Sequence, residues 1–179
     1  MTDVDDLVRA AQHGDRPAFD ALYARFGRLV YGVLLSRVGR TDAEDLVQEV
    51  FLTAFERLSS LRDPSAFGGW LAAIARRRAV DHIRRARPVD ELPDDLAAPD
   101  TAHAEASQIL AVIQRLPDAY RETLVLRLVE GMTGPEIARH TGLTEGSVRV
   151  NLHRGMKLLR ESLSGQAGGR ALGSGHVAR

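Results

Sequence analysis

The chain has 179 residues, of which 44% are hydrophobic, and its 24 Lys and Arg are balanced by 24 Asp and Glu. This length allows one domain or two small ones, and the apolar fraction excludes a disordered protein. The zero net charge gives no indication of a nucleic-acid partner. If DNA is bound, the basic residues that contact it must be concentrated locally.

The chain contains no cysteine, which excludes disulfides, cysteine-ligated zinc and a thiol nucleophile, and which fits a reducing compartment. The first residues are acidic and carry no apolar run, so they do not resemble a signal peptide. No stretch approaches the ~18 uninterrupted apolar residues that a membrane span needs. We expect a soluble, cytoplasmic protein without direct membrane insertion.

The N-terminal half begins with two predicted helices. Hydrophobic residues at helical spacing predict the first helix from Val4, with Asp3 as its N-cap. A second helix is expected to start near Pro17 and to carry a broad apolar face as far as Leu34.

Two further helices are expected in this half. Thr41 and Glu44 have the spacing of a capping box, in which Thr41 would be the N-cap of a helix that runs to about Leu58. Asp63 is followed by a proline, a combination typical of a helix start, and the helix that it opens should continue to about Arg87.

Residues 88–103 differ in composition from the rest. They include three prolines and five acidic residues and contain no Lys or Arg. Proline removes backbone donors and the acids repel one another, so this segment is predicted to be a flexible acidic linker between domains at 1–87 and 104–164. Residues 165–179 are rich in Gly, Ala and Ser and are expected to form a disordered tail.

The C-terminal half contains a predicted helix-turn-helix. Two helices, ended by Pro117 and Gly131, precede a second capping-box spacing at Thr133 and Glu136. A short helix, a turn with Gly142 and a longer final helix follow, which is the helix-turn-helix plan. No strand pattern is found, so the predicted fold class is all-α, with two small helical domains.

The final helix carries the strongest indication of DNA binding, because no acid lies between Arg149 and Arg160. A basic helix of this kind can contact phosphates and base edges in the major groove, although a packing unit with a solvated basic face is the alternative. The predicted contacts of this helix are Ser147, Arg149, Val150, Asn151, His153, Arg154 and Lys157.

An arginine cluster follows Trp70. Its arginines are Arg76, Arg77, Arg78, Arg84, Arg85 and Arg87. They are expected along one side of a helix, with Asp81 orienting Arg77 or Arg84 by an ion pair. Phosphate binding is the favoured interpretation, while a favourable interaction with the helix dipole is the alternative. Trp70 could stack on a base, but its helical spacing with other apolar residues favours a core role.

An acidic helix face lies beside an apolar stripe and consists of Asp42, Glu44, Asp45, Gln48 and Glu49. Acids in the first turns of a helix are also expected from the helix dipole. A docking face for a basic partner helix is the functional alternative, and the residues alone do not decide between the two.

Catalysis finds no support in the sequence. The six histidines are scattered without metal-ligand spacing, and there is no glycine-rich phosphate loop or nucleophile elbow. We therefore predict neither an active site nor a cofactor nor a metal.

Three segments in this order resemble the extracytoplasmic-function group of sigma-70-type sigma factors. They are DAEDLVQEVF at 42–51, FGGWLAAIARRRAVDHIRR at 67–85, and a stretch from LPDAYRETL to MKLLRE at 116–161. The resemblance implies that the first segment docks on the coiled coil of the largest subunit of core RNA polymerase. It implies that the second recognises and opens the −10 element, and that the third reads the −35 element.

The resemblance also assigns residues and partners. Residues 59–66 match a loop that helps to capture an unstacked −10 base, which adds Arg62 and Ser65 to the −10 contacts Arg76, Arg77, Asp81, Arg84 and Arg85. Phe51 joins the acidic face as a polymerase contact. The implied partners are core RNA polymerase, double-stranded and locally melted promoter DNA, and, for many relatives, an inhibitory anti-sigma factor. A stand-alone helix-turn-helix regulator is the alternative function, but it leaves the arginine cluster and the acidic helix without a shared purpose.

Overall fold

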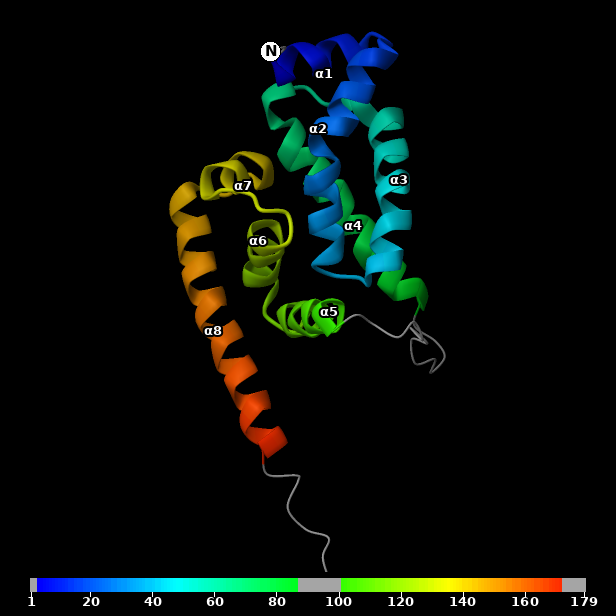
Figure 1. Ribbon diagram of the computed structural model, residues 1–179. Helices are drawn as coiled ribbons and strands as arrows, with labels where there is room; N and C mark the ends of the chain where they lie inside the picture. Colours follow the sequence, from blue (N-terminus) through cyan, green and yellow to red (C-terminus); the bar gives the residue numbers. More distant parts are fainter. Residues whose placement is uncertain (1–2, 87–100, 172–179) are drawn as a thin grey trace, which may run out of the picture.

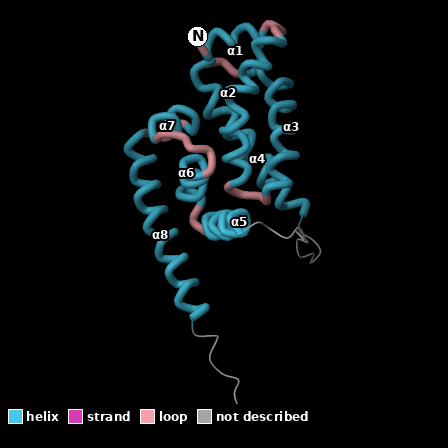
Figure 2. The backbone as a smooth tube through the Cα atoms, viewed as in Figure 1, coloured by secondary structure: helices cyan, strands magenta, loops and turns pink. Residues whose placement is uncertain are grey.

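A computed structural model describes residues 3–86 and 101–171 of the chain (Figure 1). Eight α-helices and two short 3₁₀ turns make up the described residues, and none of these residues forms a strand (Figure 2). The predicted all-α fold class is therefore confirmed.

The N-terminal bundle consists of α1 (Val4–Gln12), α2 (Arg16–Leu35), α3 (Arg40–Arg57) and α4 (Phe67–Ala86). The 3₁₀ turns Leu58–Ser60 and Pro64–Ala66 connect α3 to α4. The long helix α2 contacts α1, α3 and α4, and the successive residues Val33, Leu34 and Leu35 show that it is buried on several sides. This central position makes α2 the hydrophobic centre of the bundle.

The predicted helix starts have different outcomes. The Asp63 side chain accepts a hydrogen bond from the Ser65 backbone as a cap should, but it opens the 3₁₀ turn Pro64–Ala66, and α4 itself begins at Phe67. Helix α1 follows Asp3, although the Asp3 side chain makes no capping bond. Thr41 is not an N-cap, because Gly39 already supplies the extended backbone before the helix and α3 begins at Arg40.

The C-terminal bundle consists of α5 (Thr101–Gln114), α6 (Asp118–Leu128), α7 (Gly134–Thr141) and α8 (Glu145–Ala171). The capping box of Thr133 and Glu136 is present in both directions at the start of α7. Gly142 ends α7 with a φ of 77°, a left-handed conformation that favours glycine. These features confirm the predicted helix-turn-helix formed by α7 and α8, in which Val148 is buried and Leu143, in the turn, is 38% exposed.

Two helices extend into the segments that were predicted to be linker and tail. Residues 88–100 of the linker prediction lie outside the described residues, and 101–103 belong to α5. Helix α8 continues past Ser164 to Ala171, because extending an existing helix is much easier than nucleating one, even through a segment rich in glycine. Residues 172–179 of the tail prediction also lie outside the described residues.

The two bundles pack against each other, an arrangement that the sequence did not predict. Helix α6 lies against α2, and α7 lies against α4 (Figure 1). Two glycines permit this approach: a Cβ on Gly32 would lie 2.7 Å from Leu126, and one on Gly68 would lie 3.3 Å from the His140 backbone. The chain therefore folds into a closed arrangement, in which the bundles share an interface.

Candidate nucleic-acid interfaces and docking surface

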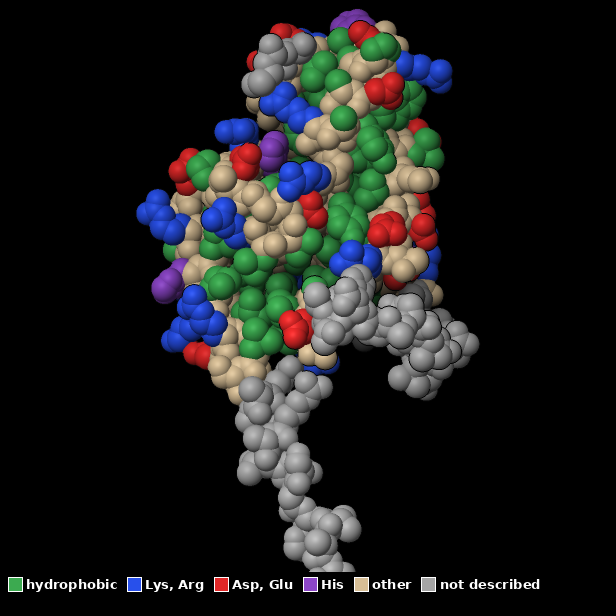
Figure 3. Space-filling view, viewed as in Figure 1, with side chains coloured by type: hydrophobic (Ala, Val, Ile, Leu, Met, Phe, Trp, Pro, Cys, Tyr) green, Lys and Arg blue, Asp and Glu red, His purple; other side chains and the backbone are tan. Residues whose placement is uncertain are grey.

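The recognition helix α8 presents its basic side chains to solvent. Arg149, His153, Arg154 and Lys157 are exposed, and Figure 3 shows basic side chains over the part of the molecule formed by α7 and α8. The start of this helix is fixed by Thr144, whose hydroxyl accepts a hydrogen bond from the Ser147 backbone at 3.1 Å. An exposed, well-anchored helix N-terminus is the geometry by which helix-turn-helix proteins enter a major groove.

Three predicted −35 contacts are placed differently from the basic ones. The Ser147 hydroxyl already bonds to that of Thr144 at 2.8 Å, so it helps to anchor the helix. Val150 is exposed and offers an apolar contact surface. Asn151 is partly buried and lines a pocket that it shares with Arg76 of α4.

The arginines of the cluster that the structure describes do not lie along one side of α4, which corrects the prediction from sequence; Arg87 lies outside the described residues. Successive helix residues are separated by about 100° of rotation, so adjacent arginines must diverge. Arg76 points to α6, where its guanidinium donates hydrogen bonds to Glu122 at 2.8 and 3.0 Å. Arg84 and Arg85 are exposed near the end of α4.

Arg77 and Arg78 instead line a pocket between α3 and α4. Thr53, Arg57, Ile74 and Asp81 complete the lining of this pocket. Among the described residues, no ion pair joins Asp81 to Arg77 or Arg84, so its predicted role as an orienting partner is not seen. Arg78 donates a hydrogen bond to the Thr53 hydroxyl at 2.7 Å, which fixes one wall of the pocket. Sequence reasoning missed Arg57, which belongs to the preceding helix.

The loop before α4 places the two remaining −10 candidates. Arg62 is exposed, and the Ser65 hydroxyl donates a hydrogen bond to Asp63 at 2.7 Å. Trp70 is partly buried with its ring centroid 5.9 Å from that of Phe67, which agrees with the favoured core role. Among the described residues of this loop, the exposed Arg62 makes no ion pair, so its guanidinium is available for a contact. The Ser65 hydroxyl, in contrast, is used to hold the turn.

The acidic face of α3 is exposed, and Figure 3 shows acidic side chains over this helix. Glu44, Asp45 and Gln48 point to solvent. Two other members of the face bind α4: Asp42 lies 3.4 Å from His82, and Glu49 lies 3.6 Å from Arg78. Glu44, Asp45 and Gln48 are therefore the part of the face most available to a basic partner.

Phe51 does not lie on the exposed face. Its side chain is 3% exposed and packs against Tyr23 with ring centroids 4.3 Å apart, because α3 turns this position toward α2. Beside it, Phe19, Leu52 and Phe55 line an apolar groove between α2 and α3. The sequence placed most of these residues on apolar helix stripes but could not indicate that Leu52 stays 61% exposed at the groove.

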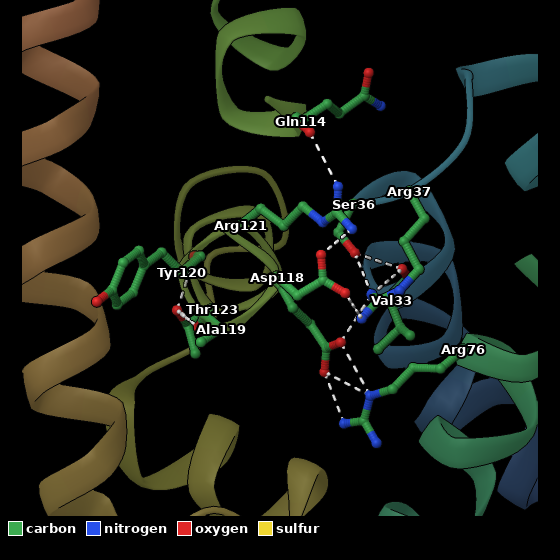
Figure 4. A network of polar contacts seen from close by, with 11 residues as sticks. Val33, Ser36, Arg37, Arg76, Gln114, Asp118, Ala119, Tyr120, Arg121 and Thr123 are labelled. Carbon is green, nitrogen blue, oxygen red and sulfur yellow. Dashed lines mark hydrogen bonds and ion pairs between the residues drawn. The ribbon is translucent and has the colours of Figure 1, made fainter. Parts of the chain in front are cut away.

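Buried charges meet at the interface between the bundles, in what we call the Glu122 cluster: Glu122, Arg37 and Arg76. Arg37 donates a hydrogen bond to Glu122 at 2.9 Å and to the Ser36 hydroxyl at 2.7 Å (Figure 4). The hydrogen bond with Glu122 raises the pKa of Arg76 and outweighs the opposing effect of burial. Arg76 therefore stays charged while it is held at the interface.

Two further polar contacts join the bundles. The Arg28 guanidinium bonds the Glu130 carboxylate at 3.3 Å and also bonds the Glu130 backbone carbonyl. Burial raises the pKa of Glu130, although Arg28 opposes this shift. The Gln114 amide donates hydrogen bonds to the backbone carbonyls of Leu35 and Val38 at 2.8 and 2.9 Å.

A histidine, His140, also lies at the interface between the bundles. The His140 ring lies edge-on to Phe26 at 5.1 Å, and its pKa is lowered by burial and by the nearby Arg139 and Arg25, with Glu136 opposing. His140 lines a pocket between the bundles, whose other titratable groups include Asp3, which precedes α1, and Asp5 of α1.

We expect acid to open the interface. Since the pKa of His140 is lower when the bundles are closed, closure is unaffected above the ordinary histidine pKa of about 6.5 and weakens as the pH falls below it. The distance between labels on α3 and α8 should increase between pH 7.5 and 5. His140→Gln should flatten this dependence and His153→Gln should not, whereas an identical profile in all three proteins would contradict the assignment.

In the residues described, no group of His, Asp or Glu is arranged to hold a metal ion. No helix in this part of the chain is both long and apolar enough to cross a bilayer.

Comparison with known proteins agrees with this geometry. The family profile Sigma-70 region 2 matches residues 22–89, and the profile Sigma-70, region 4 matches residues 106–159. The chain is 35% identical to the RNA polymerase sigma factor CarQ of Myxococcus xanthus, over 84% of this chain and 91% of that protein. It is 31% identical to the ECF RNA polymerase sigma factor BldN of Streptomyces coelicolor, over 90% of this chain and 66% of that protein.

A solved structure is also similar. CnrH in complex with the cytosolic domain of CnrY aligns with a TM-score of 0.65 and 27% identity, over 90% of this chain and 97% of CnrH. Because the alignment covers most of both bundles, the fold is shared along nearly the whole chain.

The helix-turn-helix, the exposed basic side chains of α8 and the arginine-lined pocket beside α4 are features typical of a DNA-binding protein. With the relatives described above, they identify the family. The chain belongs to the extracytoplasmic-function group of the sigma-70 family, and it is a sigma factor for promoter-directed transcription initiation.

Proposed function

We propose that this chain binds core RNA polymerase through α3 and directs it to promoters by reading the −10 element with α4 and the −35 element with α8. The observation that carries the proposal is the separation of charge on one chain. Glu44 and Asp45 are exposed on α3, while Arg149 and Arg154 are exposed on α8. The protein therefore offers one surface to a basic protein partner and another to DNA.

The proposed −35 contacts follow from the exposure of α8. Arg149 and Arg154 have the length and donor geometry for bidentate contacts to guanine, or for contacts to phosphate. Ser147 precedes these arginines and Asn151 lies between them, and both side chains carry groups that can form hydrogen bonds at the edge of the groove. His153 and Lys157 are placed to contact phosphates.

The proposed −10 contacts are Arg62, Arg77, Arg84 and Arg85, with the pocket between α3 and α4 as the site for an unstacked nucleotide. Ile74 supplies an apolar wall, Arg57 and Arg77 can bind phosphate, and Asp81 can accept a hydrogen bond from a base amino group. Removing a base from the stack costs a few kcal/mol, which contacts of this kind must offset.

The protein acts by binding, and the proposal includes no catalytic step of its own and no cofactor. We place it in the cytoplasm, where core RNA polymerase is found in bacteria. An inhibitory protein partner of the anti-sigma kind is also proposed, since CnrH was solved with the cytosolic domain of a second protein.

The proposal is tested by selecting promoter DNA with the reconstituted complex. Core RNA polymerase and the chain are mixed with DNA in which two windows, about 25 base pairs apart, are randomised. We expect recovery of sequences enriched in both windows and run-off transcription that depends on the chain. Enrichment in one window only, without polymerase, would instead indicate a stand-alone regulator.

Arginine substitutions on α8 should weaken −35 recognition. Arg149→Ala or Arg154→Ala should each cost about 1–3 kcal/mol if the side chain contacts a base in the bidentate manner, and the lost preference should fall on one base pair. Both the loss of affinity and the lost base preference are measured by titrating polymerase complexes against the selected promoter and its single-base variants. Arg115→Ala, at an exposed arginine in the turn that follows α5, is the matched control. Losses that are equal for every promoter variant would assign these residues to phosphate contact alone.

A further inference from the structure

We propose that Gln12 of α1 is a positioning residue for the −10 site, because its side-chain amide holds the loop between α3 and α4 in the conformation that presents Arg62 to promoter DNA. The inference rests on the proposed function, in which Arg62 is a −10 contact. It assigns a role to α1, which carries none of the DNA or polymerase contacts proposed above.

The Gln12 amide bridges two backbone carbonyls of this loop. Its Nε2 donates hydrogen bonds to the carbonyl oxygen of Leu58 at 3.0 Å and to that of Leu61 at 2.7 Å. A glutamine amide has two hydrogens, and a carbonyl oxygen can only accept, so the loop uses both donors of Gln12. The side chain is partly buried, which strengthens these hydrogen bonds relative to those of an amide in water.

The bond to Leu61 acts directly on the backbone of Arg62. The Leu61 carbonyl and the Arg62 N–H belong to one planar peptide group, so an orientation that is fixed at the carbonyl is also fixed at the Arg62 nitrogen. The Arg62 side chain itself is exposed. Gln12 therefore holds the backbone that carries the guanidinium proposed to contact the −10 element.

Other contacts attach the loop to the bundle. The side chains of Leu58 and Leu61 belong to the hydrophobic core, because they are only 2% and 8% exposed. The backbone at Leu58–Ser60 is a 3₁₀ turn, a structure with poorly aligned hydrogen bonds, and Asp63 caps the next turn. The buried leucines therefore keep the loop in place, and Gln12 sets the direction of its carbonyls and of the peptide before Arg62.

Helix α1 does not need the Gln12 amide for its own end. The backbone N–H groups of His13 and Gly14 donate to carbonyls in the last turn of α1, and the buried Val8 attaches the helix to the bundle. Helix α1 also contacts both 3₁₀ turns of the loop. The position of α1 along the loop thus leaves the Gln12 side chain to act on the loop.

A double-mutant cycle tests whether Gln12 acts through Arg62. Gln12→Met keeps the length of the side chain and removes both donors, while Arg62→Ala removes the guanidinium. Polymerase complexes of these two variants and of the double variant are titrated against the selected promoter and against the same promoter with a scrambled −10 window. We expect each single variant to lower the ratio of the two affinities about tenfold, and the double variant to lower it no further than Arg62→Ala does.

Two further variants serve as controls. Gln108→Met makes the same change at an exposed glutamine of α5 and should match the parent. Gln12→Lys restores donors, since an ammonium group has three hydrogens, and should recover most of the −10 discrimination. Scrambling the −35 window instead should give the same affinity ratio in the parent and in all these variants.

Amide hydrogen exchange, measured on the full chain without DNA or polymerase, reports on the loop itself. Residues 58–63 should exchange at least fivefold faster in Gln12→Met than in the parent, while the protection of α2 stays the same. An unchanged exchange rate in this segment would overturn the inference, because the loop would then be held without Gln12.

Two results of the titrations would also overturn it. One is losses that add up in the double variant, and the other is a fall in −35 discrimination together with that at −10, which would mean that Gln12→Met disturbs the whole fold. The failure of the proposed function looks different: Arg62→Ala would discriminate at −10 like the parent. The inference would then fail with the proposed contact, even if the loop exchanged faster in Gln12→Met.

Discussion

Replacing Glu44 and Asp45 together with lysine should lower the affinity for core RNA polymerase about 100-fold or more, since like charges placed opposite each other across an interface cost several kcal/mol. Both side chains are exposed on α3. Glu49 is a poorer choice, because its carboxylate lies 3.6 Å from Arg78 and a lysine there would also disturb α4. Co-purification with tagged core enzyme, followed by titration, measures the loss.

The matched control for this reversal is Glu105→Lys with Glu161→Lys, which changes the net charge by the same amount at two exposed positions on the C-terminal bundle. This control should bind polymerase like the parent. Equal losses in both double variants would mean that overall charge, and not the face of α3, governs the interaction. Unimpaired binding of the α3 variant would move the docking site elsewhere.

Truncating Phe67 to alanine should destabilise the folded protein by roughly 3–5 kcal/mol, the range for a fully buried aromatic side chain that leaves a cavity. The Phe67 ring is fully buried and packs edge-on against Phe26 at 4.9 Å. It sits at the first residue of α4, so its loss also loosens the helix that carries the arginines. Urea unfolding followed by circular dichroism gives the change in the free energy of unfolding.

Phe67→Leu is the control, because it keeps most of the buried volume and should cost less than about 1.5 kcal/mol after repacking. Tyr23→Leu, at a side chain that is 41% exposed, should have a smaller effect than Phe67→Ala. If Phe67→Ala unfolded at the same urea concentration as the parent, the ring would not be part of the core.

The sequence predicted the helices well because their determinants are local. The capping box at Thr133 and Glu136 and the turn at Gly142 depend on residues within one helical turn, and the structure has both. Thr41 shows the weakness of local rules, because its spacing to Glu44 fits a capping box while Gly39 actually precedes the helix. When two starts are compatible with the spacing, the pattern alone cannot choose between them.

The candidate site was predicted less completely, because it depends on contacts between distant parts of the chain. Arg76 and Arg77 are neighbours in sequence, yet one reaches α6 and the other the pocket beside α3. No local pattern predicts that Glu122 pairs with Arg37, because the two residues are 85 positions apart in the chain. A balanced net charge concealed this pairing, because paired and free charges count equally in a composition.

Gly32 illustrates local frustration in this fold. It lies in the middle of α2, where glycine costs roughly 0.5–1 kcal/mol relative to alanine, and the helix needs no unusual backbone angle there. The missing side chain matters only for the approach of Leu126. The residue that best suits the docked molecule is thus not the one that best suits the isolated helix, and such conflicts concentrate at functional positions.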